Sequence, residues 1–539
     1  MMKHAFVRTG VAGLVASALV VVVPPLEASA ASTSLSWGDT AQVSDAPQFS
    51  YRPRIATSAD GSRAIAIWLW SDGGNLKLQS KSATIVNGVA TWSAATVIAD
   101  RLHQDGDDPQ IVMSADGTSA AAAWLTSVGG NSVVYSRVAT VTSSGVAWGS
   151  VAGLSDVTSI ARRPRIAQSA NGAMLTAVWL QQRDGRSVVQ SRSAIVGASD
   201  ASWGTTSDLS DPAGGDVRDL SIVLSAAGTT SVATWMWLEE ERYYAYLVQT
   251  RSAMIVGNVA TWGPTTVLSD GAEGDGNYPQ VALSADGARA TAVWSGWDGQ
   301  SSTMTAQSKS ATILGNVATW STATKLSDTT QNAHDTQVVL SSDGTKATAL
   351  WSRFNGSAMV LQSSSATIVG TAATWGAVSD LGETGEPQDA AQKDRPQAAM
   401  SADGARVTAL WLLVGSDGEA LLQTGSATIA GTVAAWTDVS TLSQPDENAG
   451  YPQLAMSADG TTATVVWYGW TASRDYARIR ARTGKVVDGV APSRGGTLTS
   501  SGSSSTVWIV LIAVAGGLLL VSGGFAVARK RRSASQAAQ

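Results

Sequence analysis

The chain has no cysteine, and it has only three histidines among its 539 residues. Without cysteine it can form no disulfide framework, no thiolate metal site and no cysteine nucleophile. The three histidines are His4, His103 and His334, which lie far apart in the sequence. They offer little basis for a Ser-His-Asp triad or a histidine-rich metal centre, so catalysis of those kinds is disfavoured.

Long helical patterns are also lacking, because no stretch inside the repeated part of the chain keeps a helical apolar period over eleven residues. Tryptophan is abundant instead, with 21 residues, and a pattern of serine, a turn ending in glycine, and tryptophan occurs eight times. The tryptophan always follows the serine by ten residues, and successive copies are 55 to 60 residues apart. The pairs are Ser58 and Trp68, Ser114 and Trp124, Ser169 and Trp179, Ser225 and Trp235, Ser284 and Trp294, Ser341 and Trp351, Ser401 and Trp411, and Ser457 and Trp467.

Each copy is expected to form four short strands. The serine is followed by a tight turn such as Ala285-Asp286-Gly287, in which glycine accepts positive φ without a Cβ penalty. The segment Ala290-Thr291-Ala292-Val293-Trp294 alternates with the period of two that is typical of a strand. A second tryptophan follows the serine by 34 to 37 residues in seven copies, at Trp92, Trp148, Trp203, Trp262, Trp320, Trp375 and Trp436. The eighth copy lacks the second tryptophan, and Trp37 at the chain start supplies one. These sixteen tryptophans recur at fixed positions of the repeat, which indicates that they pack in the core.

Eight four-stranded units predict an all-β fold, an eight-bladed β-propeller over residues 34–482. The last copy stops after three strands near Arg482, while residues 34–45 match the fourth-strand segment of the other copies. The N-terminal strand should therefore complete the last blade and close the ring. A β-solenoid is the alternative, although its coils are usually shorter than this period.

Both ends of the chain carry segments outside the propeller. Residues 1–30 combine Lys3 and Arg8, an apolar run and Ala28-Ser29-Ala30, which is typical of a secretory signal peptide. Residues 483–506 are rich in Gly, Ser and Thr, which favours a linker. Residues 507–528 are uncharged over a length that spans a bilayer, and residues 529–539 begin with four basic residues, which predicts a cytoplasmic tail. We expect a single-pass protein of the cell membrane with an extracellular propeller.

The tail also resembles the cell-wall sorting signals of Gram-positive surface proteins. The segment Leu498-Thr499-Ser500-Ser501-Gly502 precedes the apolar stretch, with Thr499 where the family has proline and Ser501 where it has threonine. This resemblance implies the cell wall as an alternative location. Without the signal peptide and the tail the formal charge falls from −6 to −11, which argues against nucleic acid as a partner.

Extra aromatic residues are the candidate binding site. Four tryptophans lie two or three residues beyond the repeat tryptophan, and tyrosines lie near them. They are Trp70, Trp237, Trp297 and Trp470, with Tyr243 and Tyr468. Because blades 1 and 8 would be neighbours, as blades 4 and 5 are, we expect two opposed aromatic pairs that suit the apolar faces of sugar rings. Thicker interblade packing is the alternative.

Acidic interblade loops are candidate calcium sites. Asp105 and Asp107 lie in one loop, and Asp270 and Asp275 lie in another, spaced by glycines as a Ca²⁺ loop requires. The alternative is solvated Asp and Gly in surface turns. No other cofactor is expected.

The repeated turn resembles the Asp-box blades of sialidase-type propellers, whose motif is Ser-x-Asp-x-Gly-x-x-Trp. Here Ser58-Ala59-Asp60-Gly61 reaches Trp68 with a shifted glycine and a longer gap, and the turn joins the first and second strands. The resemblance implies a glycosidase that uses carboxylates of the propeller rim. Our principal expectation is a binding or adhesion module for glycans or a surface protein. The glycosidase is the first alternative, and a scaffold without a small ligand is the second.

Overall fold

The computed structural model describes residues 34–45, 49–71, 76–100, 102, 109–212, 214–239, 245–269, 276–298, 303–385, 395–415, 418–437, 439–470 and 477–486. All regular elements in these ranges are β-strands. None of the described residues belongs to a helix long and apolar enough to cross a membrane. The expected signal peptide, the C-terminal membrane helix and the basic tail lie outside the described residues.

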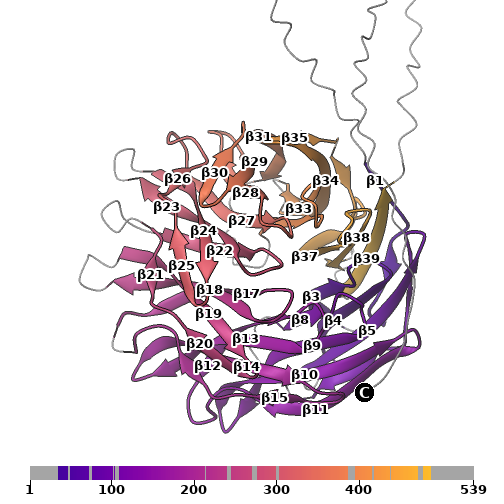
Figure 1. The fold of residues 1–539 in the computed structure, drawn as a ribbon. Helices are drawn as coiled ribbons and strands as arrows, with labels where there is room; N and C mark the ends of the chain where they lie inside the picture. Colours follow the sequence, from indigo (N-terminus) through magenta and orange to yellow (C-terminus); the bar gives the residue numbers. More distant parts are fainter. Residues whose placement is uncertain are drawn as a thin grey trace, which may run out of the picture. The chain divides into compact units, whose positions relative to one another are not determined.

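The strands form eight blades around a central opening, so the all-β eight-bladed propeller is confirmed (Figure 1). Blade 1 is β3 Phe49–Thr57, β4 Arg63–Ser71, β5 Leu76–Val86, β6 Val89–Trp92 and β7 Thr96–Ala99; blade 2 is β8 Gln110–Met113, β9 Ser119–Val128, β10 Asn131–Thr142 and β11 Gly145–Gly153; blade 3 is β12 Ala161–Gln168, β13 Met174–Arg183, β14 Arg186–Val196, β15 Ala201–Trp203 and β16 Ser207–Asp208; blade 4 is β17 Val217–Leu224, β18 Thr230–Glu239, β19 Ala245–Val256, β20 Val259–Trp262 and β21 Thr266–Val267. Blade 5 is β22 Gly276–Leu283, β23 Arg289–Asp298, β24 Thr303–Leu314, β25 Val317–Trp320 and β26 Thr324–Lys325; blade 6 is β27 Ala333–Leu340, β28 Lys346–Phe354, β29 Met359–Val369, β30 Ala372–Trp375 and β31 Ser379–Gly385; blade 7 is β32 Gln397–Met400, β33 Arg406–Val414, β34 Ala420–Ala430, β35 Val433–Trp436 and β36 Ser440–Thr441; blade 8 is β37 Asn448–Met456, β38 Thr462–Trp470, β39 Ala477–Val486, β1 Leu35–Trp37 and β2 Ala41–Gln42.

Within each blade the first three strands pair antiparallel in sequence order, and the fourth is usually broken into two short pieces. In blade 1, for example, both β6 and β7 pair with β5. One parallel bridge, between Gly385 and Val414, joins the sheets of blades 6 and 7. First strands such as β3, β17 and β27 lie beside the central opening (Figure 1). Residues of the first strands of all eight blades line the channel.

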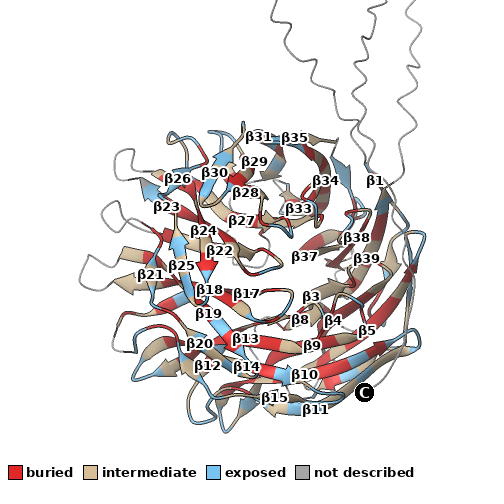
Figure 2. Ribbon diagram, in the orientation of Figure 1, coloured by how far each residue is buried: buried red, intermediate tan, exposed pale blue. Residues whose placement is uncertain are grey.

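The repeat tryptophans on the second strands fill the interfaces between blades. Trp68 of blade 1 is fully buried with Val466, Ile479 and Ala481 of blade 8, and Trp179 packs in the same way against Ala121 and Ala123 of blade 2. Each repeat tryptophan therefore faces the preceding blade. Because side chains alternate along a strand, the residues one or three positions later face the following blade. Buried residues concentrate on these second strands, whereas the hairpin tips are exposed (Figure 2).

The N-terminal strand closes the ring, as the sequence predicts. Both β1 and β2 pair antiparallel with β39, with Leu35 opposite Val486. The amide of Val43 donates to the carbonyl of Ile479 at 2.8 Å, and the Val43 side chain is fully buried between blades 8 and 1. Strand β39 continues past the expected end at Arg482 because its last residues pair with β1. Such closure rules out the open stack of a β-solenoid.

A ring of backbone hydrogen bonds joins the eight turns that begin at the repeat serines, which we call the turn ring. Six of these turns read Ser-x-Asp-Gly, and the other two have Asn171 and Ala227 in place of aspartate. In each blade the amide after the repeat serine donates to the same residue's carbonyl in the next blade, at 2.6 to 2.8 Å. The members are Ala59, Ala115, Ala170, Ala226, Ala285, Ser342, Ala402 and Ala458, and Ala458 donates back to Ala59. With strand-like spacings between the turns, the ring radius is about 6 Å at Cα, so this end of the channel is narrow.

In the six turns that have aspartate, the geometry depends on the serine, the aspartate and the glycine. The Ser58 hydroxyl donates to Asp60 at 2.5 Å and accepts from the Arg63 amide at 3.0 Å. The turn glycine has positive φ in all eight blades, for example +67° at Gly117. A Cβ at Gly117 would lie 2.8 Å from Cβ of Ser58 in blade 1, so both the backbone conformation and the neighbouring blade require glycine there.

Candidate functional site

The two ends of the propeller differ in what they present. The loops between blades and the loops between second and third strands lie at the same end, since Phe49 at the start of β3 pairs with Ser71 at the end of β4. We call this end the loop face. The opposite end carries the turn ring and is nearly the same in every blade. Differences between blades, and therefore candidate sites, concentrate at the loop face.

A β-bulge interrupts the first strand of most blades just inside the loop face. The register shifts between Tyr51 and Arg54 in blade 1, and at the equivalent place in blades 3, 4, 5, 6 and 8. The residue six positions before the repeat serine then has a φ of +45° to +57°, although it is never glycine. These residues, which occupy what we call the bulge position, are Arg52, Arg163, Asp219, Tyr278, Asp335 and Tyr451. Non-glycine residues with positive φ store strain, and the bulge directs their side chains to the channel mouth.

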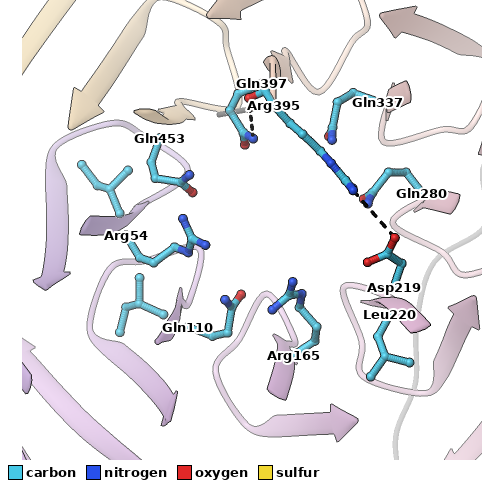
Figure 3. A pocket seen from close by; sticks show the side chains of 12 residues that line it. Arg54, Gln110, Arg165, Asp219, Leu220, Gln280, Gln337, Arg395, Gln397 and Gln453 are labelled. Carbon is cyan, nitrogen blue, oxygen red and sulfur yellow. Dashed lines mark hydrogen bonds and ion pairs between the residues drawn. The ribbon is translucent and has the colours of Figure 1, made fainter. Parts of the chain in front are cut away.

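Charged side chains from four blades meet at this mouth. Arg163 is paired with Asp219, and Arg395 of blade 7 reaches to Asp219 of blade 4, with Nη2 3.7 Å from Oδ2. The Nε atom of Arg395 lies 3.3 Å from Oδ1 of Asp335, and its Cζ atom lies 4.2 Å from the centre of the Tyr278 ring. Arg395 is only 6% exposed and spans part of the channel (Figure 3). This mouth cluster therefore ties blades 3, 4, 6 and 7 together across the axis.

Burial governs the protonation of the mouth cluster. Desolvation raises the pKa of Asp335 above its ordinary value, against the lowering effects of Arg395 and His334. It raises the pKa of Tyr278 as well, with Asp335 adding to the effect, and it lowers the pKa of His334. The carboxylates of Asp219 and Asp335 are both held by guanidinium groups, so they are engaged in holding the mouth together.

A ring of amide and guanidinium side chains lines the channel beneath the mouth cluster, at the position four residues before the repeat serine. Its members are Arg54, Gln110, Arg165, Gln280, Gln337, Gln397 and Gln453. They surround a cavity of about 270 Å³ (Figure 3). Several fold back on the chain, as Gln453 does by donating to the Pro452 carbonyl at 2.6 Å. The side-chain amides of Gln280 and Gln337, however, make no hydrogen bond to any residue that the structure describes.

Below this polar ring most of the side chains that line the channel are aliphatic. A second cavity of about 550 Å³ is lined by residues one to three positions before the repeat serine. Ala56, Val112, Val223 and Val339 are among them, and Ile111 lines both cavities. The side chains that line the channel thus change from charged groups at the mouth, through amides and guanidinium groups, to mainly aliphatic groups above the turn ring. The sequence analysis did not predict this lining. A sequence signal exists, because a polar residue recurs directly after proline in the otherwise apolar first strand, as in Pro279-Gln280.

Four aromatic rings form a row where blade 8 meets blade 1, which we call the aromatic seam. The ring centres of Tyr451 and Tyr468 are 5.3 Å apart, those of Tyr468 and Trp470 are 6.4 Å apart, and those of Phe49 and Trp470 are 6.0 Å apart. The Arg52 guanidinium lies 5.9 Å from the Tyr451 ring centre. The row begins at the bulge position of blade 8 and therefore leads outward from the channel mouth.

Of the predicted aromatic residues, those of blades 1 and 8 share one interface. Trp70 packs beside Trp68 and Tyr468 in the cluster between these blades, with the Lys77 ammonium 4.9 Å from its ring centre. Trp470 faces blade 1 through its contact with Phe49. Trp70 and Trp470 thus lie at the same interface, between blades 8 and 1, and the seam adds two aromatic residues that the sequence analysis did not single out, Phe49 and Tyr451.

The expected second pair, between blades 4 and 5, is not formed. Trp237 packs against Val178, Leu180 and Val189 of blade 3. Trp297 follows its repeat tryptophan by three residues rather than two, so it lies on the opposite face of its strand, toward blade 6, and is 37% exposed. The two side chains occupy different interfaces. Tyr243 lies outside the described residues.

The candidate calcium ligands Asp105, Asp107, Asp270 and Asp275 also lie outside the described residues. Within the ranges that the structure describes, no group of three or more His, Cys, Asp or Glu residues is arranged to hold a metal ion. Calcium binding in those two loops stays a prediction.

Neither a family model nor a curated protein matches the chain. Among solved structures, the WD40 domain of SCAP from fission yeast is 10% identical, with a TM-score of 0.46 over 84% of this chain and 97% of that one. Sqt1 from Chaetomium thermophilum is 9% identical, with a TM-score of 0.43 over 82% of this chain and 97% of that one. The β-propeller domain of the Trilobed protease from Pyrococcus furiosus is 10% identical, with a TM-score of 0.38 over 74% of this chain and 96% of that one. These likenesses concern the fold, and no argument about function rests on them.

Proposed function

We propose that this protein is a cell-surface binding module that holds glycans on the aromatic seam of its loop face. The observation that carries the proposal is the row of Phe49, Tyr451, Tyr468 and Trp470, in which each ring lies within 6.4 Å of the next. In this proposal the signal peptide exports the chain and residues 507–528 tether it to the membrane. The propeller then faces the outside of the cell.

The chemistry of the seam suits sugar rings. Phe49 is 44% exposed at the outer end of the row, and the other three rings are half-buried, so the row combines a fixed base with accessible faces. Aromatic faces contact the apolar faces of sugars, and a few polar groups fix the orientation of the ligand. The Arg52 guanidinium lies at one end of the row, 5.9 Å from the Tyr451 ring centre, and guanidinium N–H groups donate hydrogen bonds to oxygen acceptors such as those of sugars.

The carboxylates near the channel mouth favour binding over hydrolysis. A glycosidase needs one acid free to protonate the leaving group and a second to act as nucleophile or base. Asp219 and Asp335 instead share Arg395, and Asp219 is also paired with Arg163. Both carboxylates are therefore engaged with guanidinium groups and are not free to approach a glycosidic bond.

The test is a broad glycan panel presented to the full-length protein, with bound and cleaved species scored together by mass spectrometry. Trp470→Ala should weaken binding about tenfold or more, because an aromatic contact contributes on the order of 1.5 kcal/mol. Trp297→Ala is the matched control, since Trp297 is an exposed tryptophan of the loop face that lies away from the seam.

Loss of binding in Trp470→Ala but not in Trp297→Ala would support the seam. Equal binding in both variants would overturn it. Cleavage of any glycan would instead establish the glycosidase, and neither binding nor cleavage would favour a scaffold for a surface protein.

A further inference from the structure

The wall of the first channel cavity offers contacts of a kind that the aromatic seam lacks. Five glutamines contribute to it, which we call the glutamine ring, namely Gln110, Gln280, Gln337, Gln397 and Gln453. We propose that this cavity holds one terminal residue of a neutral glycan whose following residues lie on the seam. The inference rests on the proposed function, because it adds a terminal subsite for the same ligand.

Much of the hydrogen-bonding capacity of the glutamine ring is unused by the protein. The side-chain amides of Gln280 and Gln337 make no hydrogen bond to any described residue. Gln397 and Gln453 each make one, in which the side-chain amide donates to a backbone carbonyl, so no described residue donates to either side-chain carbonyl. A glutamine side chain has two N–H donors and one carbonyl acceptor, so a ligand in this cavity meets both kinds of partner.

The charged groups of the cavity wall are engaged within the protein. Arg165 donates to the Pro164 carbonyl at 3.0 Å, and both Arg54 and Arg165 have further interactions with the chain. Arg395 is paired with Asp219. The groups left to a ligand are therefore mainly neutral amides. A neutral ligand with several hydroxyl groups suits them, because each hydroxyl both donates and accepts hydrogen bonds.

The inner end of the seam lies next to this cavity. Tyr451 and Gln453 belong to the same strand, β37, and are two residues apart, which is at most about 7 Å along a strand. The Tyr468 ring centre follows that of Tyr451 at 5.3 Å. A ligand that leaves the cavity beside Gln453 therefore meets the Tyr451 ring first and the Tyr468 ring next.

The mouth cluster crosses only one side of the cavity. Figure 3 shows Arg395 reaching to Asp219 on that side. Arg54 and Gln453 lie on the other side, where none of the side chains drawn crosses the opening (Figure 3). These two residues come from blades 1 and 8, the blades that form the seam. The side of the cavity that faces the seam is thus the side open to a ligand.

The size of the cavity limits the part of a glycan that it can hold. Its volume of about 270 Å³ is just below the range of roughly 300 to 1,000 Å³ for pockets that bind drug-sized ligands. A single sugar residue therefore suits it better than a longer segment. Mainly aliphatic side chains line the channel below, so a hydroxylated residue finds its side-chain partners at the glutamine ring.

The test is calorimetric titration of the full-length protein in lipid nanodiscs with neutral tetrasaccharides of glucose, mannose, galactose and N-acetylglucosamine. Each tetrasaccharide that binds is compared with two blocked forms, which carry a bulky fluorophore at one end or at the other. We expect one blocked form to bind about tenfold more weakly or worse, because its end no longer enters the cavity. Equal affinity for the free form and both blocked forms would overturn the terminal subsite.

A double variant, Gln280→Leu with Gln337→Leu, tests the contacts of that end. Neither amide has a hydrogen bond to lose within the described protein, so the fold should be retained. Binding of the free tetrasaccharide should fall about tenfold or more, whereas the form blocked at the sensitive end should bind the double variant and the unaltered protein equally. Gln182→Leu is the matched control, because Gln182 lies on the second strand β13 and its side chain also makes no hydrogen bond to a described residue.

The outcomes separate this inference from the proposed function. If Trp470→Ala weakens binding but the double variant does not, the seam is retained and the terminal subsite is wrong. An equal loss for the free and the blocked forms in the double variant would also contradict the subsite, because it would show that the glutamines act on the fold rather than on the end of the ligand. Absence of binding by every tetrasaccharide would overturn the seam and the subsite together.

Discussion

The turn ring makes a quantitative prediction about one glycine. Gly117 has a φ of +67°, and a Cβ there would lie 2.8 Å from Cβ of Ser58 and 3.0 Å from Cδ of Arg63 in the preceding blade. Gly315 has a φ of +62°, and nothing lies within 4 Å of its Cβ position. Alanine at either position meets the same backbone penalty, about 1 to 2 kcal/mol. The two substitutions therefore differ only in the contact with the neighbouring blade.

The contact at Gly117 cannot be relieved cheaply. The Ser58 hydroxyl is fixed by hydrogen bonds to Asp60 and to the Arg63 amide, so its Cβ can move only with the whole turn. Moving that turn strains the hydrogen bond from Ala59 to Ala115, one of the eight in the ring. Overpacking of this kind costs about 1 to 3 kcal/mol. We expect Gly117→Ala to lose about 2 to 5 kcal/mol of unfolding free energy and Gly315→Ala to lose about 1 to 2 kcal/mol.

Urea unfolding at pH 7 measures the difference. Tryptophan fluorescence and far-UV circular dichroism should give coincident transitions, and the m-values of the two variants should agree, so that the midpoint shift reports stability. Equal losses in the two variants would refute the reasoning, because they would show that the turn yields without cost and that only the backbone angle matters.

Three further predictions concern other parts of the fold. Hydrogen bonds from the Ser114 hydroxyl and then the Thr118 amide lower the pKa of Asp116 in the folded protein. This carboxylate therefore contributes stability above about pH 4, and the contribution is lost as the pH falls through the lowered folded pKa. Asp116→Asn should reduce the fall of the urea midpoint between pH 7 and pH 3, and Asn171 already occupies the equivalent place in blade 3. Val43→Ala should cost about 2 kcal/mol in urea unfolding, because the side chain is fully buried between the first and last blades, and an unchanged midpoint would argue against closure there. Arg395→Gln leaves Asp335 without its guanidinium partner and should lower the free energy of unfolding by about 3 kcal/mol at pH 7. The loss should be smaller at pH 5, where Asp335, whose pKa is raised by burial, takes up a proton more readily. A loss of unfolding free energy that does not depend on pH would contradict the role of this pair.

The architecture could be predicted because its determinants are local and repeated. The ten-residue spacing from Ser58 to Trp68 is a turn plus the first six residues of the second strand, and eight copies of it define the blades. Closure could be predicted because residues 34–45 resemble the outer strand that the last copy lacks. Both inferences compare the chain with itself and need no knowledge of how distant side chains meet.

The site was harder to predict, for two different reasons. The strand face on which Trp297 lies could have been predicted. Trp297 follows Trp294 by three residues, whereas Trp237 follows Trp235 by two. Because side chains alternate along a strand, the two residues lie on opposite faces of their blades. The contact between Arg395 and Asp219 could not be predicted from the sequence, because it joins blades 7 and 4 across the channel and no local sequence pattern indicates it. The bulge that places Asp219 there is visible only in the strand register.

The two ends of the propeller are under different constraints. The repeated turn lies in the turn ring, where each blade must present the same backbone to the next, and six of its eight copies read Ser-x-Asp-Gly. The bulge position has no such constraint, and its residues are Arg52, Arg163, Asp219, Tyr278, Asp335 and Tyr451. Strain at these residues is tolerated because the closed ring fixes both ends of every first strand. A repeat protein can acquire a specific ligand only where its repeats differ, and in this chain they differ at the channel mouth and at the aromatic seam that begins there.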